Sequence, residues 1–351
     1  MKKPTSHALA LASLLGTLLA VPLVACGPDK PADRPHPRDG NDMPATSAST
    51  MASAAPTKPP AAAPSNADVK KGMAALESGD LAGARAAFEA AVARNKDDPQ
   101  AHYYLGVTLN QQKDDKGAER ELKEALRILP DLDEASANLS ALYLDQQKWA
   151  DAAAICRTAL VKSRRPELHA NLAMALAGTN DTAGAKKEFD EAAKGGDAMI
   201  LFTYATYLEK WKEVDAAAEK LRAAAKAAPD DAATLASIGF EQKNVGAFGD
   251  CVSTLDRAIA KKDNAEIRTY RALCKLGNKD KDGARADLES AIKLDPSVPP
   301  PHFYLAGRLA EAGKLPEAIA EFEAYLKLAP QGPLAAEAKK RIDVLKKKGK
   351  K

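Results

Sequence analysis

Aromatic side chains and cysteines are scarce in this sequence. Of its 351 residues, 5% are aromatic and four are cysteine, whereas 45% are hydrophobic. A chain with much apolar surface but little side-chain bulk cannot fill one deep core, so the composition favours thin layers of helix packed on helix.

A strong net charge is also missing. The total is +3, and segment 339–351 alone supplies about +7, from eight basic residues and one acidic residue. The rest of the chain is therefore acidic, which argues against a nucleic-acid-binding surface.

Residues 99–130, PQAHYYLGVTLNQQKDDKGAERELKEALRILP, have the pattern of one helical hairpin. Apolar residues fall on one face of a first helix and on one face of a second, separated by a polar turn at 113–116. Gly106 and Ala118 are small where the two helices would cross, since small side chains let two backbones approach closely. Pro130 then blocks further helix.

This pattern returns along the chain at intervals of 32 to 34 residues. The small residue near the start of the second helix recurs as Ala84, Ala118, Ala152, Ala185, Ala217, Cys251, Ala284 and Ala318. Four residues further on stand Phe88, Leu122, Cys156, Phe189, Leu221, Leu255, Leu288 and Phe322, and three beyond these stand Ala91, Ala125, Ala159, Ala192, Ala224, Ala258, Ala291 and Tyr325. Eight copies in register indicate a repeat protein.

The repeated unit resembles the tetratricopeptide repeat, a 34-residue helical hairpin with small residues at set positions and often a closing proline. The resemblance covers residues 65–332. Arg164 and Asp197 depart from it by replacing the closing proline, and Arg271 by replacing an apolar residue. It implies an all-α fold, a right-handed α-solenoid of about eight hairpins, followed over residues 333–351 by a capping helix and a basic tail.

The first 25 residues have the features of a bacterial lipoprotein signal peptide. Lys2 and Lys3 precede a mostly apolar run over residues 7–25, and Cys26 then opens a polar stretch. The LVAC sequence ending at Cys26 resembles a lipobox, in which the cysteine thiol is joined to diacylglycerol and the chain is cut before it. An ordinary secretory signal and a retained membrane anchor are the alternatives. Leu23 is large for an ordinary cleavage site, and the run is short for a membrane span.

Residues 26–64 are predicted to be a disordered tether that carries this lipid. They are rich in proline, alanine, serine and threonine, and their few apolar side chains cannot offset the entropy of ordering. About 40 such residues would span roughly 35 Å as a flexible coil and roughly 120 Å when fully extended. Several acyl chains, such as palmitate, would make the anchor permanent. Gly27 stands where enterobacterial lipoproteins retained in the inner membrane have aspartate, which implies the periplasmic face of the outer membrane.

Histidines at related positions are the first candidates for catalysis or metal binding. His102, His169 and His302 occupy comparable first-helix positions in three different repeats. Neighbouring helices pack about 10 Å apart, so these rings cannot share a metal ion. The sequence also has no GxSxG, HExxH, CxxC or phosphate-binding loop. We therefore expect no catalytic site, metal, cofactor or small-molecule substrate; an enzyme with an unrecognised site is the remote alternative.

Three cysteines lie within the repeats. In an oxidising compartment this odd number permits one disulfide and leaves one thiol free. Cys156 occupies a core position. Cys251 begins the second helix of repeat six and Cys274 lies late in the first helix of repeat seven, and because these neighbouring helices run antiparallel, both fall near the same end. A Cys251–Cys274 disulfide is our hypothesis, and two small buried thiols are the alternative.

In the tetratricopeptide family, first-helix residues at set positions line a concave groove. Mapping these positions onto this chain gives Tyr103, Tyr104, Asn110, Asn138, Asn171, Phe202, Thr206, Tyr270, Phe303 and Tyr304. Rings supply contact area at low entropy cost and asparagines can hydrogen-bond a backbone, so this set suits an extended peptide. For any one ring, packing between neighbouring helices is the alternative. The asparagine of the family's chaperone-tail clamp is absent from its usual position.

The sequence thus predicts a non-enzymatic scaffold in the bacterial envelope, with protein or extended-peptide partners. Related lipoproteins act in pilus, secretion or outer-membrane assembly, and this resemblance implies a role of that kind. An adaptor for a cell-wall enzyme is the alternative, because the long tether would permit it. Neither nucleic acid nor a small-molecule substrate is expected, and contact with the membrane is expected through the N-terminal lipid.

Overall fold

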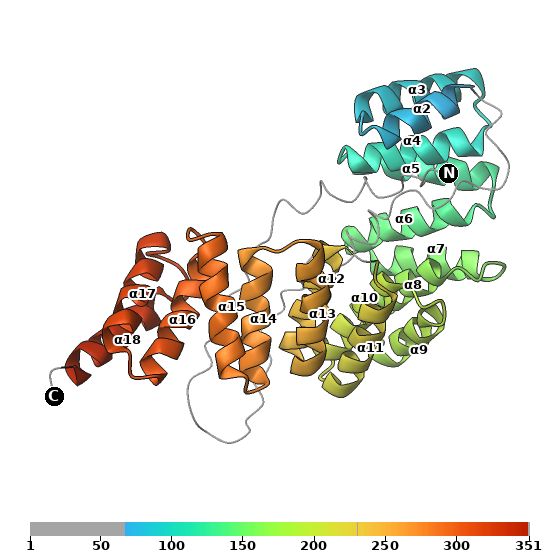
Figure 1. Ribbon diagram of the computed structural model, residues 1–351. Helices are drawn as coiled ribbons and strands as arrows, with labels where there is room; N and C mark the ends of the chain where they lie inside the picture. The colour runs from blue at the N-terminus through green and yellow to red at the C-terminus, as the bar shows by residue number, and fades with distance from the viewer. Residues whose placement is uncertain (1–66, 230, 350–351) are drawn as a thin grey trace, which may run out of the picture. The chain divides into compact units, whose positions relative to one another are not determined.

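The structure of the chain is a computed structural model that describes residues 67–229 and 231–349. These residues form 17 α-helices and no strand, in a succession that Figure 1 shows. None of these helices combines the length and the apolar character that a membrane crossing needs. The predicted signal peptide, the lipidation site Cys26 and the tether all lie outside the described residues.

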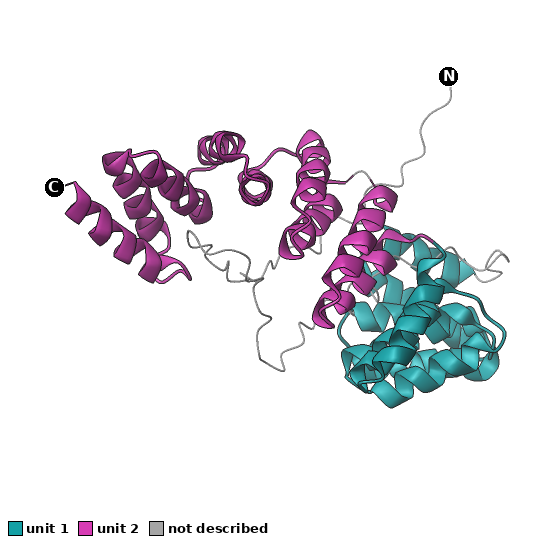
Figure 2. Cartoon of the chain, turned by 90° about the horizontal axis from the view of Figure 1, so that it is seen from below, with its two compact units in different colours: residues 1–18, 40–195 teal, residues 19–39, 196–351 magenta. Residues whose placement is uncertain are grey.

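The helices pair into hairpins within two compact units (Figure 2). The first unit, described over residues 67–195, contains α2 (Ala67–Glu77) with α3 (Leu81–Arg94), α4 (Pro99–Gln111) with α5 (Asp115–Ile128), α6 (Asp133–Asp145) with α7 (Trp149–Leu160), and α8 (Pro166–Gly178) with α9 (Thr182–Ala193). The second unit, from residue 196 onward, contains α10 (Ala198–Lys210) with α11 (Val214–Ala227), α12 (Ala232–Asn244) with α13 (Phe248–Lys261), α14 (Ala265–Gly277) with α15 (Lys281–Leu294), and α16 (Pro299–Glu311) with α17 (Leu315–Leu328). A single helix, α18 (Ala335–Lys348), follows and packs on α17.

The residues that carry the repeat pattern form the cores of the hairpins. All eight small residues from Ala84 to Ala318 are fully buried, and the apolar residues four positions further on are at most 1% exposed. The third set is buried as well, except for Ala159, which is half-buried near the end of α7. The predicted all-α arrangement of successive hairpins with a terminal capping helix is confirmed.

Gly106 shows why small residues are needed where the two helices of a hairpin cross. A Cβ atom added to this glycine would lie 2.8 Å from Cγ of Leu122 and 3.3 Å from the carbonyl oxygen of Ala118. Any side chain at residue 106 would therefore push α4 and α5 apart. Ala118, on the other side of the same crossing, is fully buried.

Replacing Ala118 with leucine should lower the free energy of unfolding by about 1 to 3 kcal/mol, because the larger side chain overpacks this crossing. Urea denaturation followed by circular dichroism would measure the change. The matched control is Ala93→Leu, because Ala93 is an exposed residue of α3 and should tolerate the extra bulk. Equal unfolding curves for wild type and Ala118→Leu would contradict the assigned crossing.

Each hairpin turn contains one residue with a left-handed backbone conformation. The dihedral angle φ lies between 57° and 79° at Gly79, Lys113, Gln147, Asn180, Lys212, Gly246, Lys279 and Gly313. Each of these residues precedes the small residue of the second helix by five positions, so the turns repeat at the same intervals as the cores. The turn geometry is thus common to all eight hairpins, although only three of the eight residues are glycine.

The structure joins Cys251 on α13 to Cys274 on α14 by a disulfide, with 6.1 Å between their Cα atoms. This is the pairing that the antiparallel run of the two helices suggested. The bond links the sixth hairpin to the seventh. Cys156 is a free, buried thiol, and burial raises its pKa to about 12.

Candidate binding surface

The first helices of successive hairpins form a row in the first unit and, over α12, α14 and α16, in the second unit. In the first unit α2 contacts α4, α4 contacts α6, and α6 contacts α8; in the second unit α12 contacts α14, and α14 contacts α16. The second helices mainly contact the first helices on either side of them. Because the first helices lie closer to one another than the second helices do, they form the inner side of the curve of each unit. We call this surface the inner row.

Three of the predicted residues link the helices of the inner row in the first unit. Asn138 on α6 donates a hydrogen bond from Nδ2 to Oη of Tyr103 on α4, at 3.3 Å. Asn171 on α8 donates from Nδ2 to the carbonyl oxygen of Ala137 at 3.0 Å and to Oγ of Ser140 at 2.9 Å, both on α6. These hydrogen bonds form a polar ladder from α4 through α6 to α8.

One atom of the ladder has no partner. The side-chain oxygen Oδ1 of Asn171 accepts no hydrogen bond from any residue that the structure describes, although Asn171 is 3% exposed. A buried acceptor without a donor costs free energy. Because this oxygen is itself buried, it belongs to the packing between α6 and α8 and a partner cannot reach it.

Tyr104 and Phe303 have packing roles instead of the predicted surface roles. Each is 2% exposed. Tyr104 stacks on Phe88 of α3, with 5.5 Å between ring centroids. Phe303 lies 5.3 Å from the ring of Phe322 and 5.5 Å from that of Tyr325, both on α17. These two rings therefore hold helices together and are not available to a partner.

The other predicted residues are half-buried, namely Asn110, Phe202, Thr206, Tyr270 and Tyr304. Thr206 donates from Oγ1 to the carbonyl oxygen of Thr203 at 2.7 Å, within its own helix. Tyr270 lies 5.1 Å from the ring of Phe240 on the preceding first helix, and its Oη donates to Glu266 at 3.0 Å. Tyr270 and Phe240 thus join two helices of the inner row in the second unit while part of each ring stays exposed.

The three histidines form hydrogen bonds within their own hairpins. In each case Nδ1 faces a glutamate 19 residues later on the second helix, at 2.7 Å for His102 with Glu121, 2.7 Å for His169 with Glu188, and 2.6 Å for His302 with Glu321. No group of three or more potential metal ligands gathers anywhere in the described part of the chain. The histidines therefore link paired helices, which accounts for their related positions.

His102 has a contact at each ring nitrogen, because Nε2 also lies 3.0 Å from the carbonyl oxygen of Lys96. The hydrogen bond with Glu121 raises the pKa of His102 above its ordinary value of 6.5 and outweighs the opposing effect of burial. The same hydrogen bond lowers the pKa of Glu121. Below the raised pKa of His102, a buried imidazolium therefore pairs with a buried carboxylate between α4 and α5.

This pair should make the first unit less stable as the pH rises. The raised pKa of His102 contributes stability that is complete below about 6.5 and is lost as the pH rises through the folded-state pKa. We expect His102→Gln to cost about 1.5 to 3 kcal/mol at pH 6, where the charged hydrogen bond is intact, and much less at pH 9. Urea denaturation of both proteins at the two pH values measures this difference. An equal cost at both pH values would show that the imidazole pairs while neutral.

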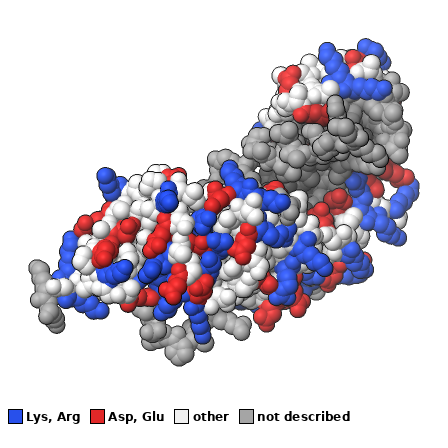
Figure 3. Space-filling view, in the orientation of Figure 1, with Lys and Arg blue, Asp and Glu red and all other residues white. Residues whose placement is uncertain are grey.

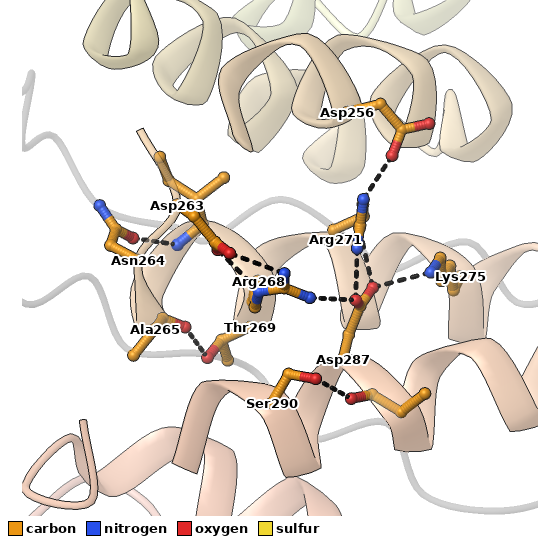
Figure 4. A network of polar contacts seen from close by, with 12 residues as sticks. Asp256, Asp263, Asn264, Ala265, Arg268, Thr269, Arg271, Lys275, Asp287 and Ser290 are labelled. Atoms are coloured by element: carbon orange, nitrogen blue, oxygen red, sulfur yellow. Dashed lines mark hydrogen bonds and ion pairs between the residues drawn. The ribbon is translucent and has the colours of Figure 1, made fainter. Parts of the chain in front are cut away.

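The seventh hairpin replaces this histidine pair with a larger network of charges (Figure 4). Arg268 and Asp287 stand in the histidine and glutamate positions, again 19 residues apart, with 3.4 Å between their charged atoms. Asp287 also accepts hydrogen bonds from Nε of Arg271 at 2.8 Å and pairs with Nζ of Lys275 at 2.8 Å. Arg271 reaches back to Asp256 on α13 at 2.6 Å.

Asp287 is the centre of this network. Its side chain is 4% exposed, and burial opposes its ionisation. Hydrogen bonds from Arg271 and Lys275 outweigh that effect and lower the pKa of Asp287 below its ordinary value. Arg271, which departs from the repeat pattern, is thus an inward-facing residue whose charge is neutralised by Asp287 and Asp256.

Away from this network, charges of both signs are interspersed on the face that Figure 3 shows.

Two segments of the chain, residues 69–133 and 276–333, match the family described as Tetratricopeptide repeat. These two segments therefore have the sequence pattern of tetratricopeptide repeats. The first matched segment covers the hairpins α2–α3 and α4–α5, and the second runs from the end of α14 through α17.

No curated protein sequence matches this chain. Among solved structures, it is similar to yeast Tom70, with a TM-score of 0.49 and 17% identity over 87% of this chain and 70% of that one. It is also similar to pilF of Pseudomonas aeruginosa, with a TM-score of 0.46 and 17% identity over 69% of this chain and 96% of that one.

Proposed function

We propose that this chain is a non-enzymatic scaffold that holds an extended segment of a protein partner along the inner row. The observation that carries the proposal is the set of half-buried polar and aromatic residues on the first helices, which includes Asn110 and Asn138 in the first unit. An asparagine side chain can both donate to and accept from a peptide backbone. In the second unit the half-buried Phe202, Tyr270 and Tyr304 offer apolar contact area for side chains of the same kind of partner.

We further propose that the scaffold is anchored in the bacterial envelope, on the periplasmic face of the outer membrane, where it takes part in assembling an envelope complex. The lipobox-like sequence before Cys26 and the proline-rich tether that follows support this location. The tether would let the repeats reach partners well away from the bilayer.

Replacing Cys26 with serine should move the protein from the membrane fraction to the soluble fraction, because the residue that would carry the lipid is lost. Fractionation of cells that express each protein, followed by immunoblotting, measures the distribution. Cys156→Ser is the matched control, since it removes a thiol that lies in the core of the repeats. Unchanged membrane association of Cys26→Ser would contradict the lipid anchor.

Site-specific photo-crosslinking in cells tests the binding surface. A photoreactive phenylalanine analogue would replace Phe202, Tyr270 or Tyr304 on the inner row, or the exposed second-helix residues Glu219 and Glu289 as controls. We expect specific proteins to crosslink from the inner-row positions and not from the controls. Crosslinks from Glu219 and Glu289 that match those from the inner row would place the partner elsewhere on the repeats. Mass spectrometry would then identify the partner, and a cell-wall enzyme among the crosslinked proteins would favour the adaptor role.

A further inference from the structure

Helix α18 has two chemically different sides. One side is apolar, because Ala335, Ala338, Ile342 and Leu345 are buried, and it covers the last hairpin. The other side carries four exposed lysines, namely Lys339, Lys340, Lys347 and Lys348, which we call the α18 basic face. At 3.6 residues per turn these four positions fall within half of the helix circumference.

The four lysines of the α18 basic face have no acidic partner among the described residues. Other cations of the same helix do have one, since Arg341 pairs with Glu337 at 2.8 Å and Lys346 pairs with Glu323 at 3.1 Å. Two acidic residues lie on the same side, Asp343 and Glu337, and Glu337 is the partner of Arg341. Two more lysines, Lys350 and Lys351, follow in the sequence. The end of the chain therefore presents a concentrated positive charge that the protein itself does not neutralise.

We propose that the α18 basic face binds the surface of a membrane that contains anionic phospholipid. A cluster of four to eight basic residues is the usual requirement for attraction to anionic headgroups. The choice of lysine supports lipid over an acidic protein, because lysine is depleted at protein interfaces, where arginine is enriched. Arginine gives directional, bidentate contacts, whereas the compact ammonium group of lysine suits a diffuse negative surface.

The apolar content of this face sets how the helix would lie on the membrane. Val344, which is 51% exposed, is its single large apolar side chain, and the face has no aromatic residue. Deep insertion into a membrane needs a broad apolar face, but the apolar side of α18 already packs on the repeats. The helix would therefore rest on the headgroups through charge alone. This inference does not depend on the lipid anchor at Cys26, because it requires only anionic lipid and α18.

Lysine footprinting of the full chain tests the proposal at single-residue level. The protein would be labelled with an amine-reactive reagent in the presence of vesicles of phosphatidylcholine alone or with about one third phosphatidylglycerol. We expect labelling of the α18 basic face to slow several-fold on the anionic vesicles only, and the effect to disappear in 0.5 M salt, where the screening length is about 4 Å. Unchanged labelling, or equal protection by both kinds of vesicle, would overturn the proposal.

Matched variants give a second, independent readout. In one variant the four lysines of the α18 basic face become glutamine; in the control, the exposed Lys70, Lys71, Lys113 and Lys116 of the first unit become glutamine. The measurement is the ratio of partitioning onto anionic over neutral vesicles, in which any contribution of the apolar N-terminus is common to both proteins. We expect this ratio to fall roughly 600-fold for the α18 variant, at about fivefold per lysine, and to stay near the wild-type value for the control.

Two outcomes would assign the face differently and overturn the proposal. An equal fall in both variants would show a general effect of net charge. Protection of the same four lysines by poly-L-glutamate, without protection by anionic vesicles, would assign the α18 basic face to an acidic protein segment.

Discussion

Replacing Asp287 with asparagine should lower the free energy of unfolding of the second unit by about 3 to 5 kcal/mol, the usual cost of removing one partner of a buried charge network. The substitution keeps the size of the side chain and removes its charge. Arg271, Lys275 and Arg268 would then lose the carboxylate that all three contact. Urea denaturation followed by circular dichroism measures the loss.

Asp256 provides the matched control, because it binds the same Arg271 from the surface side of the network. Its side chain is 54% exposed, compared with 4% for Asp287. Exposed ion pairs contribute about 0 to 1 kcal/mol, so Asp256→Asn should have a small effect. Equal losses for the two variants would show that burial does not determine the strength of this network.

Loss of the Cys251–Cys274 disulfide should cost the second unit about 3 kcal/mol, the second largest effect that we expect. The bond joins residues 23 positions apart. In the chain-entropy account, a closed loop of this length restricts the unfolded chain by about that amount. Comparing unfolding with and without reductant, in wild type and in a Cys251→Ser, Cys274→Ser double variant, measures it. Reductant should destabilise the wild type and leave the double variant unchanged.

Thiol titration of denatured, unreduced protein checks the bond directly. Within the repeats, Cys156 alone should react. It should be inert in the native state, because its thiol is fully buried and its pKa is raised to about 12. Three reactive thiols within the repeats of the denatured chain would contradict the disulfide.

The fold follows from the sequence because each hairpin repeats the same local requirements. A small residue at every helix crossing, such as Ala118, and an apolar residue one turn later, such as Leu122, can be read from spacing alone. Arg271 could not be interpreted in that way. Its position departs from the pattern, and its partner Asp287 lies on the other helix of the hairpin. The sequence did contain one signal for Asp287. The 19-residue spacing that pairs His102 with Glu121 also pairs Arg268 with Asp287, so it could have identified Asp287 as an inward-facing acidic partner.

The binding surface was less predictable than the fold, because a first helix of the inner row is contacted on several sides. Tyr103 and Tyr104 are adjacent in the sequence, so their side chains point about 100° apart around the helix axis. That rotation places Tyr103 against Asn138 of the next first helix and Tyr104 against Phe88 of the preceding second helix. Spacing identifies the helix face only approximately, whereas neighbouring side chains decide which ring is covered.

The division into two compact units gives the protein a built-in pair of optical probes. The sequence contains two tryptophans. Trp149 lies in the first unit, where its indole packs over Gly178, and Trp211 lies in the second, with its ring centroid 5.7 Å from that of Tyr207. Changing either tryptophan to phenylalanine leaves a fluorophore in one unit only. The two single-tryptophan proteins would therefore allow the unfolding of each unit to be followed separately by its own emission.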